Sequence, residues 1–234
     1  MSTESREQWT LGITGLCLAL VLPIAVFTTR LYLNTDGDSA ADCVSLTGTL
    51  EFQDQTQSMK DRHILLLGRR TLSQWQGSSD WQRKPFIVRT SRAFRPGVLS
   101  TCFSRAIAYY HPNTTILVLE PEDIVDEGES TIEALESLIE QRDYWSTSPQ
   151  LTIMLPFRGP RFRADTHLWQ NFKTELLSTI DALGFSLIDP NTALEGGTNT
   201  INPDWYWPDG ITPTEEAYRR VYSTLAQSIG ISGL

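Results

Sequence analysis

Five short apolar runs separated by longer amphipathic stretches restrict the fold of this chain more than any other feature. The runs are continuous in their apolar character, as in strands that are covered on both faces. They lie at 63–68, 85–89, 115–119, 151–156 and 185–189, and helical patterns occupy 97–110, 130–142, 164–183 and 213–229. Strands that alternate with such helices favour a parallel sheet with right-handed crossovers. The sequence therefore predicts an α/β fold over residues 61–234, with a five-stranded, flavodoxin-like parallel sheet between two helical layers.

The composition excludes several classes of protein. The chain has 234 residues, a formal net charge of -9 and 40% hydrophobic residues. An acidic chain lacks the broad basic surface that nucleic acids require, so we expect no nucleic-acid partner. The apolar content is too high for a disordered chain. The sequence contains no cofactor motif and no metal-ligand spacing, and we expect neither a cofactor nor a metal.

An uncharged apolar segment at 9–29 precedes the alternating region. About 20 such residues span the hydrocarbon core of a bilayer as a helix. We expect an uncleaved transmembrane anchor after a short tail, 1–8, and the alternative is a cleaved signal peptide. Arg6 and Arg30 balance each other across the segment. The short tail nevertheless favours a periplasmic or lumenal location for the bulk of the chain.

The stretch 30–60 is polar and predicts a linker, with one short strand near Thr49–Phe52. Two cysteines follow the apolar segment, Cys43 and Cys102. An oxidising compartment would permit them to form a disulfide. The alternative is two unrelated small buried residues, because sequence alone does not place their Cα atoms within bridging distance.

Three segments are informative together: ILLLGRRTLSQW at 64–75, TILVLEPEDI at 115–124 and YWPDGITPTEEAYRRV at 206–221. They resemble three sequence blocks of SGNH (GDSL-type) hydrolases. The resemblance covers roughly residues 60–232 and implies an SGNH-type sheet with its site at the carboxyl ends of the strands. It also implies a setting, because membrane-anchored SGNH-like proteins often accompany membrane-bound O-acyltransferases in cell-envelope polysaccharide modification.

The residues that the resemblance would make catalytic are largely replaced. Arg69 and Arg70 stand where the family has Asp and its nucleophilic Ser, Glu122 replaces the oxyanion Asn, and Thr212 replaces the His base. Only Asp209 of the final pair is retained. A guanidinium does not attack an ester at neutral pH, and a hydroxyl is not a base there. The sequence therefore predicts a pseudoenzyme. Thr212 also begins a T-P-T-E capping box, which predicts that it is the N-cap of the last helix.

A relocated catalytic site is the alternative, which would make the chain an active esterase or O-acyltransferase. Ser73 and Ser91 follow the first two predicted strands, and His167 lies near the same edge of the sheet. His63 and His111 belong to the opposite edge. Geometry and not mere presence defines a catalytic triad, so the sequence leaves this alternative open.

Arginines gather in the loops that follow the predicted strands. Eight of them are expected at this edge: Arg69, Arg70, Arg89, Arg92, Arg95, Arg158, Arg161 and Arg163. The planar guanidinium suits carboxylate and phosphate groups, which predicts an anionic ligand such as an acidic glycan or a phosphorylated molecule. The alternative is internal pairing with the acidic residues of the same edge: Glu120, Glu122, Asp123, Asp189 and Asp209.

The sequence thus favours a membrane-anchored accessory or binding protein for an anionic ligand or partner, with an O-acyltransferase as one possible membrane partner. A structural subunit of a membrane assembly is a further alternative.

Overall fold

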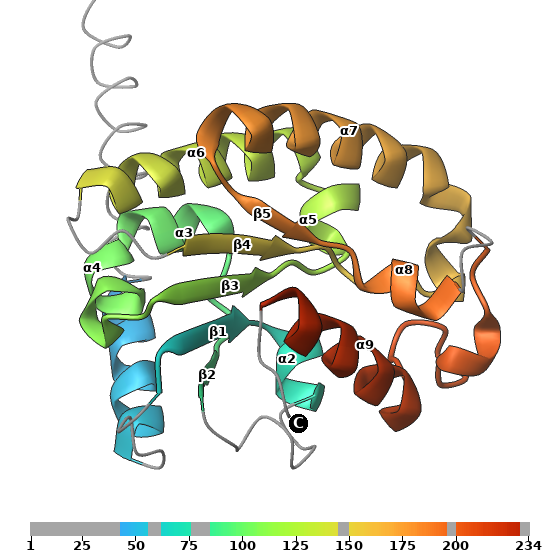
Figure 1. Cartoon of the computed structure of the whole chain (residues 1–234), viewed down its shortest axis with the longest axis horizontal. Coiled ribbons are helices and arrows are strands. Elements are labelled where there is room, and N and C mark those ends of the chain that lie inside the picture. The colour runs from blue at the N-terminus through green and yellow to red at the C-terminus, as the bar shows by residue number, and fades with distance from the viewer. Residues whose placement is uncertain (1–42, 56–61, 76–84, 145–149, 196–199, 230–234) are drawn as a thin grey trace, which may run out of the picture. The chain divides into compact units, whose positions relative to one another are not determined.

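A five-stranded parallel sheet forms the centre of the computed structural model, in the order β2-β1-β3-β4-β5 (Figure 1). The structure describes residues 43–55, 62–75, 85–144, 150–195 and 200–229. The strands are β1 (Ile64–Gly68), β2 (Phe86–Thr90), β3 (Thr114–Val118), β4 (Gln150–Met154) and β5 (Ser186–Ile188). Each predicted apolar run therefore overlaps a strand, and the predicted α/β class and parallel sheet are confirmed.

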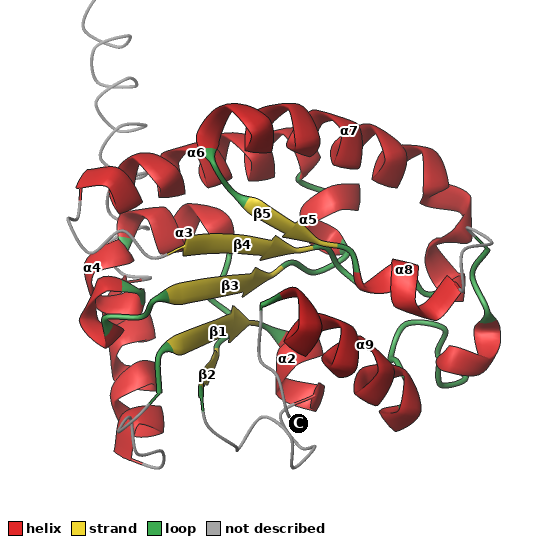
Figure 2. Ribbon diagram, viewed as in Figure 1, coloured by secondary structure: helices red, strands yellow, loops and turns green. Residues whose placement is uncertain are grey.

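Helices cover both faces of the sheet (Figure 2). One face carries the helix at 43–55, α3 (Pro96–Thr101), α4 (Phe103–Ala106), α5 (Glu122–Val125), α6 (Gly128–Tyr144) and α7 (Thr166–Leu183). The other face carries α2 (Arg70–Trp75), α8 (Pro190–Glu195) and α9 (Glu215–Ser228). Alternate residues of each strand enter the two cores: Leu65 and Leu67 belong to the core on the α6 side of the sheet, and Leu66 belongs to the core on the α9 side. Three 3-10 turns, Ala108–Tyr110, Pro160–Asp165 and Pro203–Trp205, complete the described elements.

The segment at 43–55 is a helix, so the strand predicted near Thr49–Phe52 is wrong. Leu46 and Leu50, one helical turn apart, are fully buried against the sheet. This part of the predicted linker therefore belongs to the folded domain. A disulfide joins Cys43 to Cys102, with 5.5 Å between their Cα atoms.

The helix predicted at 97–110 is divided into α3, α4 and a 3-10 turn. The first break falls at Cys102, whose backbone leaves the helical region with φ -100° and ψ 19°. The last turn ends at His111, which adopts a left-handed conformation with φ 46°. The apolar periodicity of this stretch was correct, but the sequence did not show that the disulfide-linked residue interrupts it.

The tail at 1–8 and the anchor predicted at 9–29 lie outside the described residues. Within the part of the chain that the structure describes, no helix has the length and apolar character needed to span a membrane.

Candidate functional site

Loops from distant parts of the sequence meet at the carboxyl ends of β1, β3 and β4. The amide of Arg161, after β4, donates to the carbonyl of Gly210 at 3.1 Å. Gly159 lies so close to this turn that an added Cβ would be 2.2 Å from the Gly210 carbonyl oxygen. Only a residue without a side chain fits there. The Asp209 turn is thus held against the β4 loop at the edge where the resemblance places the site.

A buried carboxylate occupies the start of α2. Both oxygens of Glu120 accept hydrogen bonds from Thr71, one from its amide and one from its hydroxyl, each at 2.7 Å. Glu120 is 2% exposed. Its burial raises its pKa, and the bonds from Thr71 oppose that rise. An internal carboxylate therefore occupies one backbone amide and one hydroxyl next to Arg70.

A second buried carboxylate pairs with Arg69. The guanidinium of Arg69 lies 2.5 Å from Asp123, whose carboxylate also accepts from the amide of Glu120 at 2.8 Å. Burial raises the pKa of Asp123, and Arg69 acts against this. Arg69, which stands where the resemblance expects Asp, therefore forms a structural ion pair with Asp123.

The Asp209 turn carries threonine where the resemblance expects histidine. The hydroxyl of Thr212 donates to Asp209 at 2.6 Å, and the amides of Ile211 and Thr212 donate to the same carboxylate at 2.9 Å. The bond from the Thr212 hydroxyl, more than the other contacts, lowers the pKa of Asp209. Thr212 is therefore not the N-cap of α9. Thr214 caps that helix by accepting from the amide of Ala217.

Arg70 lies on the exposed first turn of α2, where the resemblance expects the nucleophile. Its guanidinium lies 3.5 Å from Glu122, and both side chains are about half exposed, at 48% and 47%. The charge of Arg70 also contributes to the lowered pKa of Asp209. Such a solvent-exposed ion pair contributes little to stability and is easily exchanged for another partner.

The eight candidate arginines do not form one cluster. Arg89 lies inside the domain, where it donates to Asp54 at 2.7 Å, so its expected place at the carboxyl edge is wrong. The strand continues past it to Thr90, and its side chain therefore points onto a face of the sheet. Arg158 pairs with Glu195, and Arg95 pairs with Glu127 at 2.9 Å.

Three further candidates are exposed and pair with no described carboxylate: Arg92, Arg161 and Arg163. Within the described residues, five of the eight arginines pair internally. Only Arg69 and Arg70 pair with acids that the alternative interpretation named, Asp123 and Glu122.

A hollow of about 370 Å³ lies at the carboxyl ends of β1 and β2. Three of the predicted arginines line it together with three hydroxyl-bearing residues: Arg69, Arg70, Arg92, Ser73, Thr90 and Ser91. We call it the arginine hollow. None of these lining residues is acidic, so every charge on its walls is positive.

A second hollow, of about 340 Å³, flanks the other side of α2. Its base is aromatic, because buried Trp75 stacks on Tyr218 with 5.2 Å between ring centroids. Trp207 lines it while remaining 57% exposed. Gln74 and Glu215 supply polar groups at its rim. We call it the aromatic hollow.

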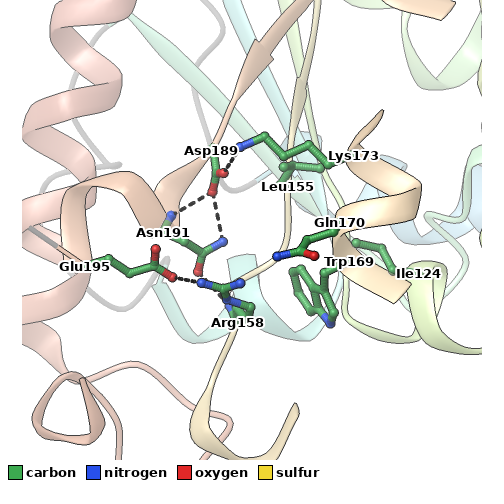
Figure 3. Close-up of a pocket in the computed structure, with 9 residues that line it drawn as sticks. All are labelled: Ile124, Leu155, Arg158, Trp169, Gln170, Lys173, Asp189, Asn191 and Glu195. Carbon is green, nitrogen blue, oxygen red and sulfur yellow. Dashed lines mark hydrogen bonds and ion pairs between the residues drawn. The ribbon is translucent and has the colours of Figure 1, made fainter. Parts of the chain in front are cut away.

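A third pocket, of about 180 Å³, lies at the carboxyl ends of β4 and β5 (Figure 3). We call it the β4–β5 pocket. Its lining comes from the strand ends and from α5, α7 and α8: Ile124, Leu155, Arg158, Trp169, Gln170, Lys173, Asp189, Asn191 and Glu195. Only Arg158 and Asp189 of this set were expected at the edge of the sheet from the sequence.

The comparisons with known proteins agree with this architecture. A GDSL-like lipase from Bacteroides thetaiotaomicron superposes with a TM-score of 0.61 at 15% identity, over 79% of this chain and 97% of that one. A catalytic mutant of an acetylxylan esterase from Geobacillus stearothermophilus gives a TM-score of 0.52 at 11% identity, over 74% and 97%. The chain has the fold of the GDSL-like hydrolases. No family model and no curated protein matches its sequence.

On this GDSL-like fold, no hydrogen bond joins the serines and histidines of the alternative catalytic site among the described residues. Ser73 donates its hydroxyl to the carbonyl of Arg70 at 2.7 Å, and Ser91 accepts from the amide of Ala93 at 3.2 Å. His167 is exposed in the first turn of α7 and makes no hydrogen bond to a described serine. His63 lies beside the start of β1 and His111 precedes β3, as expected.

Several residues around these hollows differ from the sequence expectation or were not predicted. The aromatic run at 205–207 favours a place in the core, with an exposed face for sugars as the alternative, and the structure leaves Trp207 57% exposed. Trp169, Gln170 and Lys173 lie on a helix that reads as an ordinary amphipathic one. Only the packing of α7 beside the ends of β4 and β5 gives these side chains a shared pocket. No group of three potential ligand side chains for a metal occurs among the described residues.

Proposed function

We propose that this chain is a non-catalytic domain of the GDSL-like hydrolase fold that binds an anionic ligand in the arginine hollow. The observation that carries the proposal is the lining of that hollow, in which three guanidiniums and three hydroxyls meet without a carboxylate. Guanidinium and hydroxyl donors suit the oxygens of carboxylate or phosphate groups. This local positive charge contrasts with a net charge of -9 for the whole chain.

The pairing of the arginines supports an exchangeable ligand. Arg92 is exposed and has no ion pair among the described residues. Arg70 has only a long, half-exposed contact with Glu122 at 3.5 Å. An incoming anion therefore need not break a buried ion pair to reach these two donors. Arg69 would remain on Asp123 and serve as a fixed wall.

The absence of catalysis is supported by the groups at the corresponding positions. Arg70 is not a nucleophile, and Thr212 directs its hydroxyl to Asp209. Glu120 already accepts from Thr71 where a reaction would need donors for an oxyanion. Acyl transfer by this site would require all three features to change.

The proposed setting is the extracytoplasmic side of a membrane, with residues 9–29 as the anchor. The ligand class that best suits the neighbouring hollows is an acidic glycan. Exposed Trp207 offers an aromatic face for a sugar ring on one side of α2, and the arginine hollow offers cations on the other. A role beside an O-acyltransferase in polysaccharide modification follows from the resemblance and is part of this proposal.

Titration calorimetry with an acidic oligosaccharide and with inorganic phosphate tests the anion site. We expect Arg92→Gln and Arg70→Gln each to weaken binding by about tenfold, since each removes a charged donor. Arg219→Gln is the matched control, because Arg219 is an exposed arginine of α9 that does not line the hollow. Equal losses in all three variants, or no binding at low salt, would refute the anion site.

A fluorophosphonate probe tests the lack of catalysis separately. We expect no covalent labelling of the full-length protein. Labelling of any serine would show a relocated nucleophile and would overturn the non-catalytic part of the proposal, whatever the result for anions.

A further inference from the structure

The β4–β5 pocket has rigid polar walls before any ligand enters. Asn191 is 6% exposed and accepts from the amide of Arg158 at 2.7 Å. Its side-chain amide donates to the carbonyl of Pro156 at 3.0 Å and to Asp189 at 2.9 Å. These bonds tie the ends of β4 and β5 together. The side chains on this side of the pocket are therefore held in place by the fold (Figure 3).

The charges that line the pocket are balanced in pairs. Lys173 donates to Asp189 at 2.6 Å, and the guanidinium of Arg158 donates to Glu195. Two positive and two negative groups leave no net charge. An anion entering the pocket would meet both carboxylates, and a cation would meet the ammonium and the guanidinium. The pocket therefore favours an uncharged occupant.

The hydrogen-bonding groups that remain are of both kinds. Gln170 is exposed, and its side-chain amide makes no hydrogen bond with a described residue. Its NH2 group and its carbonyl oxygen are therefore available to a ligand as donor and acceptor. The ammonium group of Lys173 has three N–H donors, and one of them binds Asp189. Carboxylate oxygens of Asp189 retain accepting capacity. Adjacent donors and acceptors match hydroxyl groups, each of which donates and accepts.

Apolar surface completes the lining. Ile124 and Leu155 contribute aliphatic carbon, and Trp169 contributes an indole that is 5% exposed. The volume of about 180 Å³ is smaller than that of typical sites for drug-sized ligands, so the occupant is small. A sugar ring combines hydroxyl groups at its edge with carbon–hydrogen faces, and it suits this mixture of walls.

We propose that the β4–β5 pocket is a second ligand site, and that it takes a single uncharged sugar ring. The site is independent of the arginine hollow, whose lining residues it does not share. The arginine hollow would then accept an anionic ligand and the β4–β5 pocket an uncharged one. Either proposal can therefore fail without the other.

Saturation-transfer NMR on the full-length protein tests this site, in a detergent without a sugar head group. The probes are methyl β-glucoside, methyl β-galactoside and methyl N-acetyl-β-glucosaminide, with methyl β-glucuronide and phosphate as anionic competitors. We expect at least one neutral glycoside to bind, and neither anion to displace it. Gln170→Ala should weaken that binding by roughly fivefold, because it removes one hydrogen-bond donor and one acceptor from the pocket.

Asn171→Ala is the matched control, since Asn171 is the exposed neighbour on α7 that does not line the pocket. Lys173→Gln gives an independent measurement. It leaves the carboxylates in excess, and the pocket should then prefer a cationic methyl glucosaminide over methyl glucoside. The proposal is overturned if no neutral glycoside binds, if Gln170→Ala and Asn171→Ala have equal effects, if phosphate competes, or if Lys173→Gln leaves the preference unchanged.

Discussion

The two ends of the sheet's carboxyl edge use charged residues in different ways. At the β1–β2 end, the arginine hollow presents Arg70 and Arg92 with no acidic residue in its lining. At the β4–β5 end, Arg158 is 8% exposed, and its charge is matched by Glu195. Arginines at the same edge of the sheet therefore line a positive hollow at one end and a neutral pocket at the other.

The difference arises from where the carboxylates are used. Near β1, the carboxylates of Glu120 and Asp123 are buried and bind Thr71 and Arg69. Neither of them lines the arginine hollow, and Glu122 reaches Arg70 only through a half-exposed contact at 3.5 Å. Near β5, Asp189 stays at the pocket wall and pairs with Lys173. The position of the acids relative to each hollow thus decides whether an arginine there remains open to an external anion.

The largest expected effect is the loss of the buried pair at the β1–β2 end. Arg69→Met leaves Asp123 buried without its cation and should lower the free energy of unfolding by about 3–5 kcal/mol. Arg70→Met is the control, because its pair with Glu122 is exposed and should be worth at most about 1 kcal/mol. Urea unfolding of both variants measures the two values. Similar values would show that Arg69 is not a structural residue.

Removal of the disulfide should have the next largest effect. The bond spans 59 residues and fixes the helix at 43–55, whose Gln53 holds Thr90 at the arginine hollow through two hydrogen bonds. The Cys43→Ser/Cys102→Ser variant should lose about 2–4 kcal/mol of stability.

The same variant should also weaken phosphate binding while leaving glycoside binding in the β4–β5 pocket unchanged. Thermal unfolding and the two binding assays together check this asymmetry. Parallel losses in both binding assays would contradict it.

Adding a carboxylate should make the arginine hollow resemble the other end. Ser91→Asp keeps an oxygen that can accept from the amide of Ala93, so the turn should be retained. The new charge offsets one guanidinium, and phosphate should bind about tenfold more weakly. Ser223→Asp, on the exposed side of α9, is the control for a change of net charge. Calorimetry at low salt compares them, and equal losses would refute a local effect.

The smallest expected effect concerns pH. Burial raises the folded-state pKa of Glu120, so the folded protein binds more protons than the unfolded chain between the ordinary carboxyl pKa and the raised one. Stability contributed by this group is present below that window and is lost as pH rises through it, by at most about 1.4 kcal/mol per pH unit. Glu120→Gln should remove this slope. Urea unfolding between pH 4 and 8 measures it, and identical slopes would contradict the assignment.

The sequence by itself determined the strands, the helices α6, α7 and α9, and the edge of the sheet where a site should lie. These follow from local apolar patterns and from the geometry of parallel sheets, in which all strands end at one edge. The helix at 43–55 was missed, because its polar residues conceal the two leucines that pack on the sheet. The pairing of Cys43 with Cys102 remained one of two alternatives until the structure joined them.

Only the tertiary structure decided which of the gathered charges remain open. The sequence shows how many arginines and acids lie near the edge of the sheet. Which of them form ion pairs depends on distance and burial, and these depend on residues far apart in the chain. Arg89 illustrates this, because its partner Asp54 comes from a segment that read as a linker. Burial of Glu120 and Asp123 removed two acids from the surface, whereas Asp189 stayed at the wall of a pocket. Desolvation and packing, which no local pattern encodes, thus made the arginine hollow positive and the β4–β5 pocket neutral.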